Sequence, residues 1–173
     1  MSRGFVGQPT YNSAPIATES MTLEHSNAPF GVVLVADSDG FCRIPDKDNI
    51  LGKGASTGVA VGILLHQKAE DMPCLVPLVP PVGSGDLRYA KEKQVVSLMK
   101  EGAVFIKTET DVTRNDPVYY RVTSSDIGNL GGIRNDDDGG KAVKLNGAVY
   151  AMSAKAGEIV EITVNLNQIQ ERY

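Results

Sequence analysis

The chain has 173 residues, of which 42% are hydrophobic, and this size suits one domain with its own apolar core. Its net charge of −4, without any long basic run, argues against a nucleic-acid partner, because phosphate binders carry a basic face. The longest apolar stretch, residues 59–66, is far shorter than the roughly 20 residues that span a bilayer, so we expect no membrane partner.

The composition also constrains the core and the cellular setting. There are 18 glycines and 9 prolines, which indicate many short elements joined by turns, and there is no Trp, which leaves the core largely aliphatic. The first residues lack the hydrophobic segment of a signal peptide, so we expect synthesis in a cytosol. Cys42 and Cys74 lie outside any CxxC pair, and we expect free, buried thiols, with a disulfide between them as the alternative.

The first twenty residues show no sustained hydrophobic period. They mix glycines, prolines and small polar residues with isolated apolar ones, which predicts an extended N-terminal arm (residues 1–20) before a β-rich body (residues 21–173). Three interpretations remain open at this point. The arm contacts a neighbouring subunit through its apolar residues, or it is a floppy terminus, or its apolar residues cover the protein's own core; they are Phe5, Val6, Tyr11 and Ile16.

From residue 21 onward the pattern becomes that of β-strands. Residues 30–36 are apolar and rich in β-branched side chains, and the turn residues 37–40 separate them from a hairpin partner at 41–44. Residues 49–58 are rich in glycine and predict a loop. Residues 59–66 then predict a buried strand, with a short helix as the alternative.

The second half of the chain continues in the same way. Prolines between residues 72 and 86 predict an irregular or edge-strand connection, because proline cannot donate to a sheet ladder. Residues 94–99 and 103–108 then alternate on either side of Lys-Glu-Gly, which predicts a hairpin with its turn at 100–102.

The remaining strands complete the predicted fold. A strand at 118–123 follows a turn at 114–117, and a closing hairpin joins 148–153 to 158–164. Short strands separated by turns, without a convincing helix, indicate an all-β fold: a single compact β-barrel or β-sandwich domain of short strands with an extended N-terminal arm.

A search for catalytic, cofactor-binding or metal-binding motifs is negative. Gly52-Lys53-Gly54 lacks the other residues of a phosphate loop. Asp136-Asp137-Asp138 lacks the ligand spacing of a calcium loop and predicts a solvated hairpin tip, with an adventitious or interfacial cation as the alternative. His25 and His66 are the only histidines, and no nucleophile elbow accompanies them. We therefore expect no enzyme and no cofactor, although a Ser/Lys or carboxylate pair assembled in space stays open.

The order of segments in the second half resembles that of the bacteriophage structural cement (capsid decoration) family. The resemblance covers residues 95–164 and rests on segments 88–107, 116–120, 131–134 and 148–150 followed by a final alternating strand. It implies a non-enzymatic protein that binds the outer surface of a phage capsid and bridges neighbouring major capsid protein subunits. It also implies a place on the capsid exterior of the virion, after assembly in the host cytoplasm.

Partners and contact residues follow from this resemblance. It implies the major capsid protein and further copies of the chain as partners, with a homotrimer on local threefold positions preferred to a homodimer. Phe5, Val6, Tyr11 and Ile16 are the first candidates for the interface, and the loops 49–58 and 73–85 are the second. The alternatives are another virion structural protein, a glycan- or receptor-binding β-module, for which the chain is poor in aromatic residues, and a small hydrolase.

Overall fold

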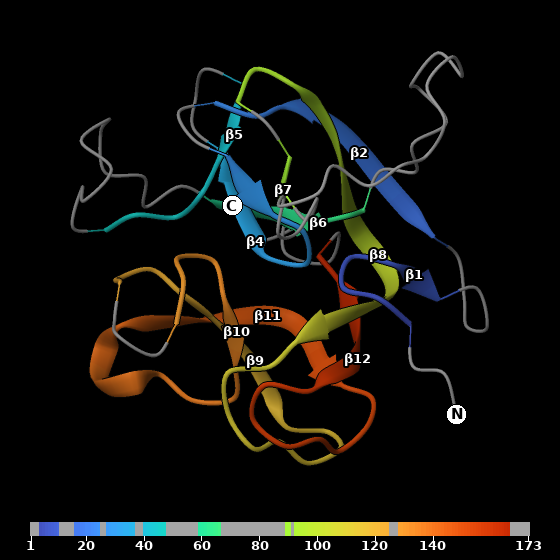
Figure 1. The fold of residues 1–173 in the computed structure, drawn as a ribbon, viewed down its shortest axis with the longest axis vertical. Coiled ribbons are helices and arrows are strands. Elements are labelled where there is room, and N and C mark those ends of the chain that lie inside the picture. The colour runs from blue at the N-terminus through green and yellow to red at the C-terminus, as the bar shows by residue number, and fades with distance from the viewer. Residues whose placement is uncertain are drawn as a thin grey trace, which may run out of the picture.

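The computed structural model (Figure 1) describes residues 4–10, 16–24, 27–36, 40–47, 59–66, 89–90, 92–124 and 128–166. The loops expected at 49–58 and 73–85 lie outside these residues, as do Tyr11, His25 and Cys74. In the described part of the chain, no helix is long and apolar enough to span a bilayer.

The fold is all-β, as expected from the sequence. One short 3-10 turn, η2, accompanies the strands. The strands are β1 (Pro9–Thr10), β2 (Ala17–Thr22), β3 (Ala28–Pro29), β4 (Val33–Ala36), β5 (Cys42–Arg43), β6 (Val59–Leu64), β7 (Tyr89–Ala90), β8 (Val95–Lys107), β9 (Pro117–Arg121), β10 (Ile133–Arg134), β11 (Ala142–Tyr150) and β12 (Ile159–Asn165), with η2 (Asp138–Gly140) before β11.

Strand β8, with 13 residues, organises the sheet. Met99, in its first half, pairs with both β2 and β6, and Ala103, in its second half, pairs with both β1 and β12. Glu101 pairs with both β2 and β12, so these two strands lie on opposite edges of β8. One edge therefore carries β2 and β1 end to end, and the other carries β6 and β12, as Figure 1 shows.

The hairpin predicted at residues 100–102 is wrong, because 95–107 form one continuous strand. Glu101 stays in the ladder, and the Lys100 carbonyl accepts a hydrogen bond from the Leu166 amide at 2.9 Å. Gly102, with φ of 133°, bends the strand without reversing it. Pairing with strands distant in the sequence thus outweighs the local turn preference of Lys-Glu-Gly.

Each half of the sheet curls back toward its own beginning. In the first half the order continues from β6 to β4 and β5, and a bridge between Cys42 and Leu23 returns the sheet to the end of β2. In the second half the order runs from β12 through β11 and β9 to β10, and a bridge between Ile133 and Thr108 returns it to the end of β8. The predicted hairpins of β4 with β5 and of β11 with β12 are confirmed.

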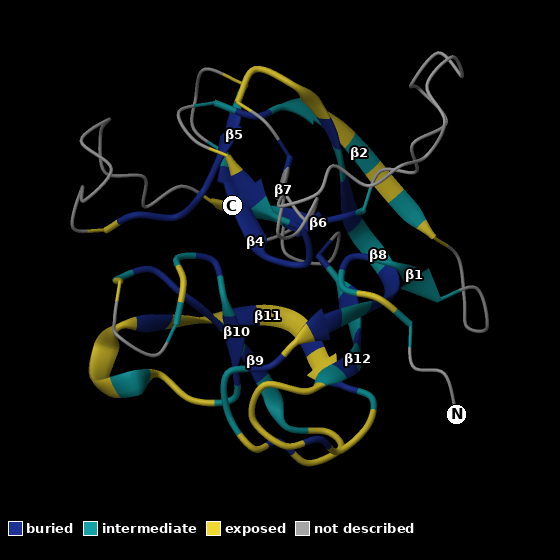
Figure 2. Cartoon of the chain, in the orientation of Figure 1, coloured by how far each residue is buried: buried dark blue, intermediate teal, exposed yellow. Residues whose placement is uncertain are grey.

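The middle layer of the molecule, formed by β4 and the second half of β6 (residues 62–64), is buried on both faces (Figure 2). Val33 and Ile63 point into the core that β9 to β12 enclose, whereas their neighbours Leu34 and Leu64 point into the core of the first half. This double burial explains why residues 30–36 and 59–66 are continuously apolar in the sequence, without alternation of apolar and polar residues. Strand formation at 59–64, predicted over a short helix, is confirmed.

Candidate functional site

The described N-terminal residues, 4–10, lie on the body in the seam between β8 and the end of β6. The Gly7 amide donates to the Phe105 carbonyl at 2.7 Å, and the Phe105 amide donates to the Gln8 carbonyl at 3.0 Å. On the other side of the seam, the His66 amide donates to the Gly7 carbonyl at 2.9 Å. The segment therefore joins two strands of the body through its backbone, and it continues into β1 on the edge of β8.

Glycines make this close approach possible. At Gly7, φ is 80° and an added Cβ would lie 2.7 Å from the His66 amide nitrogen, which leaves no room for a side chain. Gly31, on the facing segment, has a φ of 76° and leaves its space to the Val6 side chain. The seam is therefore shaped to this N-terminal sequence.

Three rings meet over the segment. His66 lies between Phe5 and Phe30, with ring centroids 4.8 Å and 4.7 Å away. Burial lowers the pKa of His66, which favours the neutral ring in this apolar setting. The histidine thus packs against the arm, in line with the structural role expected for it.

Three of the four arm residues named from the sequence, all except Tyr11, lie in the described part of the chain. Phe5 is 49% exposed and Ile16 is 38% exposed, whereas Val6 is half-buried. The expected division at residue 20 falls inside β2, because Ala17–Thr22 pairs with β8. The described arm residues thus cover part of their own body and also retain exposed apolar surface.

Val6 borders a pocket of about 370 Å³ between the two halves of the sheet. Its apolar wall consists of Val6, Pro29, Phe30, Val32 and Ile133. Its polar residues include Lys107 and Glu109, and Glu109 is already engaged by arginine side chains. A small hydrolase needs convergent polar groups that can contact a substrate. Glu109 at this pocket does not meet this need, because its carboxylate is held by Arg121.

An ion-pair network closes the second half of the sheet. The Arg121 side chain is fully buried; its Nη2 donates to Glu109 Oε2 at 2.7 Å, and its Nη1 donates to Asp138 Oδ2 at 2.7 Å. Arg134, itself 5% exposed, places Nη1 3.0 Å from Asp138 Oδ2 and pairs with Asp136 through Nε. Two buried cations are thus matched by three carboxylates from two separate segments.

This network corrects the expectation of a solvated tip for Asp138 alone, because Asp136 and Asp137 are exposed. Asp138 turns inward, with φ of 47°, and the hydrogen bond from Arg121 lowers the pKa of its carboxyl. In the described residues, no group of three or more His, Cys, Asp or Glu side chains is arranged to hold a metal. The sequence signal for the network was an arginine at the end of each of two otherwise apolar strands, β9 and β10.

A second polar cluster fixes the turn before β9. Asp116 accepts hydrogen bonds from the Thr113 amide at 2.8 Å, the Thr113 hydroxyl at 2.7 Å and Asn135 Nδ2 at 3.0 Å. Asn115, with φ of 71°, adopts the left-handed conformation that asparagine tolerates. The turn predicted at 114–117 is confirmed in this form.

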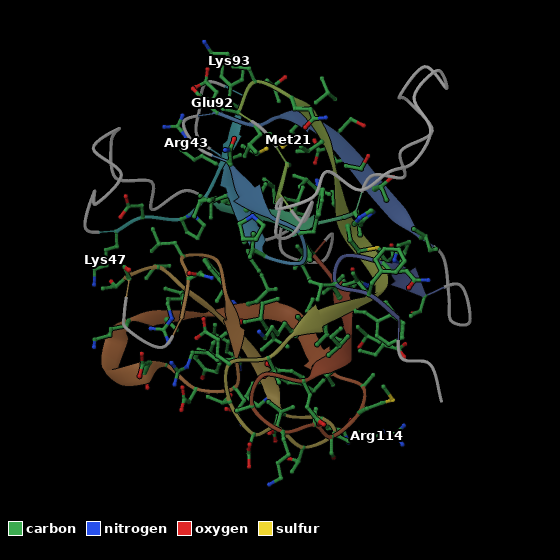
Figure 3. All side chains as sticks on the ribbon, in the orientation of Figure 1. Met21, Arg43, Lys47, Glu92, Lys93 and Arg114 are labelled. Atoms are coloured by element: carbon green, nitrogen blue, oxygen red, sulfur yellow. The ribbon has the colours of Figure 1, made fainter. Side chains whose placement is uncertain are left out.

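Exposed apolar side chains occur in both halves of the sheet. In the first half they include Val59 (69% exposed) and Val95 (59%), and in the second half Val143 (44%), Val149 (41%) and Met152 (39%). Figure 3 places Lys93 at one end of the molecule and Arg114 at the opposite end. Exposed apolar side chains are thus spread over both halves of the sheet.

Cys42 is a free, buried thiol, as expected. Its Sγ donates to the Thr22 carbonyl at 3.5 Å, and burial raises its pKa to about 11. The thiol therefore stays protonated and packs as a small apolar side chain.

The comparison with family models places this all-β chain in a class of proteins, the structural proteins of phage virions. The family model described as "Structural cement protein (E217 gp24/Pam3 gp6)" matches residues 1–165. The chain belongs to this family of phage cement proteins, and it is a structural protein associated with the capsid of the virion. No curated protein sequence matches it.

Two solved structures are similar to the chain. One belongs to "The capsid of Myoviridae Phage XM1", with a TM-score of 0.67 and 16% identity over 95% of this chain and 92% of that one. The other is described as "The crystal structure of head fiber gp8.5 N base in bacteriophage phi29", with a TM-score of 0.45 and 10% identity over 88% and 96% of the two chains. At this identity, the first likeness supports the fold.

Proposed function

We propose that this cement protein binds the outer surface of the phage capsid and bridges neighbouring major capsid protein subunits, so that it stabilises the shell without catalysing a reaction. A bridge needs a stiff body with contact surfaces at separate places. Strand β8 supplies the stiff element, because its 13 residues measure about 40 Å along the strand and belong to both halves of the sheet.

The observation that carries this proposal is the distribution of exposed apolar side chains over one continuous sheet. Val95 opens β8 and Met152 follows β11 in the other half, and both are more than a third exposed. Side chains of this kind stabilise a complex when a partner removes them from water. Two such regions on one body allow one copy to contact two capsid subunits. Because many copies bind a symmetric shell, their contributions to its stability add up.

The arm supplies a further contact in this proposal. Phe5 and Ile16 keep exposed apolar surface while residues 4–10 hold their backbone on the body. Val6 and Tyr11 complete the set of proposed interface residues. Self-association into a closed oligomer, with a trimer preferred to a dimer, belongs to the same proposal.

The direct test is to mix purified protein with capsids assembled without it. Light scattering measures the mass of the free protein, and cosedimentation measures the number of copies bound. We expect a closed oligomer that saturates the shell at a fixed ratio and raises the temperature at which the shell disassembles. A monomer that leaves the capsids unoccupied would refute the proposal, and a glycan array would then test the receptor-binding alternative.

The arm is best tested by substitution, since removal of residues 1–20 would also remove β1 and part of β2. We expect Phe5→Ser and Ile16→Ser to lower occupancy on capsids while the thermal midpoint changes little, because both side chains are already partly in water. Lys93→Ser, at an exposed turn, serves as the control. Unchanged occupancy in both arm variants would leave the arm with the single role of covering its own body.

A further inference from the structure

The second half of the sheet has an outer face, opposite the core, which the strand register defines. One row across five strands consists of Pro117, Val149, Thr163, Ala103 and Thr10. The next row consists of Ala151, Glu161, Phe105 and Gln8, joined by the hydrogen bonds Ala151 N to Glu161 O and Phe105 N to Gln8 O. Neighbouring residues along the same strands, such as Val104, Tyr150 and Ile162, point into the core.

The chemistry of this outer face is that of an interface centre. Val149 is 41% exposed, and Phe105, Thr163 and Pro117 are half-buried, whereas the small side chain of Ala103 between them is fully buried. In these two rows of described residues, Glu161 is the one ionisable side chain, and the Thr10 hydroxyl donates to its Oε1 at 3.1 Å. Protein interfaces are depleted of charge at their centres, so this composition favours contact with protein.

The outer face is continuous with the arm. Strand β1 contributes Thr10 and Gln8 to the two rows, and Gly4 lies directly against the Phe105 ring. Ile16, which is 38% exposed, lies beside Gly102 on the central strand β8. A partner that covers the outer face therefore meets arm residues at its border.

We infer that the outer face docks on the capsid shell, against a flat and largely uncharged protein surface. This inference rests on the proposed function and names the surface that performs it. Strands about 4.8 Å apart and rows about 7 Å apart give the nine residues of the face roughly 300 Å², less than half of what each partner buries in a stable pair. A second copy bound here alone would dissociate readily, whereas a shell that also holds the arm and many further copies retains a small contact.

The strand β11 offers a matched pair of variants, Val149→Glu and Val143→Glu. Both valines are exposed to a similar extent, 41% and 44%. Val149 pairs with Pro117 and Val143 pairs with Tyr120. Because Pro117 and Tyr120 are three positions apart in one strand, the two valines lie on opposite faces.

Cosedimentation of each full-length variant with capsids assembled without this protein tests the inference. We expect Val149→Glu to weaken binding about tenfold or more, and Val143→Glu to stay within about twofold of the wild type. Thermal unfolding of the free proteins tests whether both variants fold. If Val149→Glu does not fold, Thr163→Glu, in the same row, takes its place.

The possible results separate the two proposals. Wild-type binding together with an unaffected Val149→Glu overturns the assignment of the face and leaves the capsid-binding function standing. Loss of self-association in Val149→Glu, with capsid binding retained, would show that the face joins copies of the chain and would also overturn the assignment. Failure of the wild-type protein to bind refutes the function itself.

Discussion

Arg121 is the side chain on which the second half of the sheet depends most. It is fully buried, and it neutralises Glu109 and Asp138, which come from different parts of the chain. We expect Arg121→Met to lower the free energy of unfolding by about 3–5 kcal/mol, because removal of one partner leaves buried carboxylates without their main cation. Denaturant unfolding measures the change.

Arg114→Met provides the matched control for this prediction. Arg114 lies in an exposed turn at the lower end of the molecule in Figure 3. Its replacement should change the free energy of unfolding by no more than about 0.5 kcal/mol. Equal effects of the two substitutions would mean that the network contributes nothing beyond a surface ion pair.

Asp116 gives the fold a dependence on acid. Hydrogen bonds from the Thr113 amide, the Thr113 hydroxyl and Asn135 lower its pKa below the ordinary value of 3.8. A carboxyl whose pKa is lower in the folded state contributes stability that is complete above its unfolded pKa and is lost as pH falls through the folded one. We therefore expect the free energy of unfolding to decline below about pH 4.

The variant Asp116→Asn should flatten this decline, because the amide has no proton to gain. Urea unfolding at a series of pH values between neutral and strongly acidic measures the slope. Asp137→Asn, at an exposed neighbouring loop, should keep the slope of the wild type. An unchanged slope in Asp116→Asn would assign the acid sensitivity to the other carboxylates.

The residues of the ion-pair network show which contacts a sequence does not reveal at the residue scale. The run Asp136–Asp138 is visible in the sequence, but its partners Arg121 and Glu109 come from distant strands and loops. Only the fold brings them together, and so local pattern alone suggested a solvated tip. An arginine within an apolar strand was the available signal, since a buried cation requires a carboxylate partner.

At the scale of elements, the sequence was sufficient for two hairpins whose strands are neighbours along the chain, whereas the neighbouring pair of β9 with β10 was not predicted. The pairs β4 with β5 and β11 with β12 are separated by turn residues and were predicted in place. Strand β8 was divided wrongly, because its ladder partners β2 and β12 lie far away in the sequence. Pairing with a distant strand leaves no local signal in the sequence except the alternation of apolar and polar residues. This alternation is present on both sides of Gly102, so it did not show that the two sides form one strand.

The bend at Gly102 leads to a prediction about β8. Its φ of 133° is nearly restricted to glycine, and an added Cβ would lie 3.0 Å from Met99 Sδ. We expect Gly102→Ala to reduce the free energy of unfolding by about 2–3 kcal/mol. Gly157→Ala, with φ of 81° and open space around the new methyl group, should cost about 1 kcal/mol.

Comparison of the two alanine variants by denaturant unfolding separates the packing of β8 from the general preference for glycine at positive φ. If Gly102→Ala is no worse than Gly157→Ala, the bend relaxes easily and does not position the two halves of the sheet. A larger effect at Gly102 supports a fixed bend.

At the scale of the whole molecule, the two halves share more than β8. The Val33 amide donates to the Gly131 carbonyl at 3.0 Å, and the Lys47 amide donates to the Val122 carbonyl at 2.8 Å, so loops of one half bind the other. The layer of β4 and β6 also packs against both cores. The apolar runs in the sequence indicated burial, but not that one layer would serve two cores.

We therefore expect cooperative unfolding of the whole body in a single transition. Hydrogen exchange measured by mass spectrometry should report equal losses of protection in β6 and β12 when Arg121→Met destabilises the second half. A loss confined to β9 to β12, with β6 unchanged, would show that the halves open independently.

The placement of β1 and β2 along a single edge of β8 has a mechanical consequence. Backbone hydrogen bonds between antiparallel strands lie across the strand axis. A pull on the N-terminal segment along that axis would strain all the bonds of β1 and β2 to β8 together, in shear, whereas a sideways pull would peel them apart in succession. A neighbour that binds the arm and pulls in line with β8 would therefore meet more resistance than one that pulls across β8, and the direction of the arm would set the force that the contact withstands.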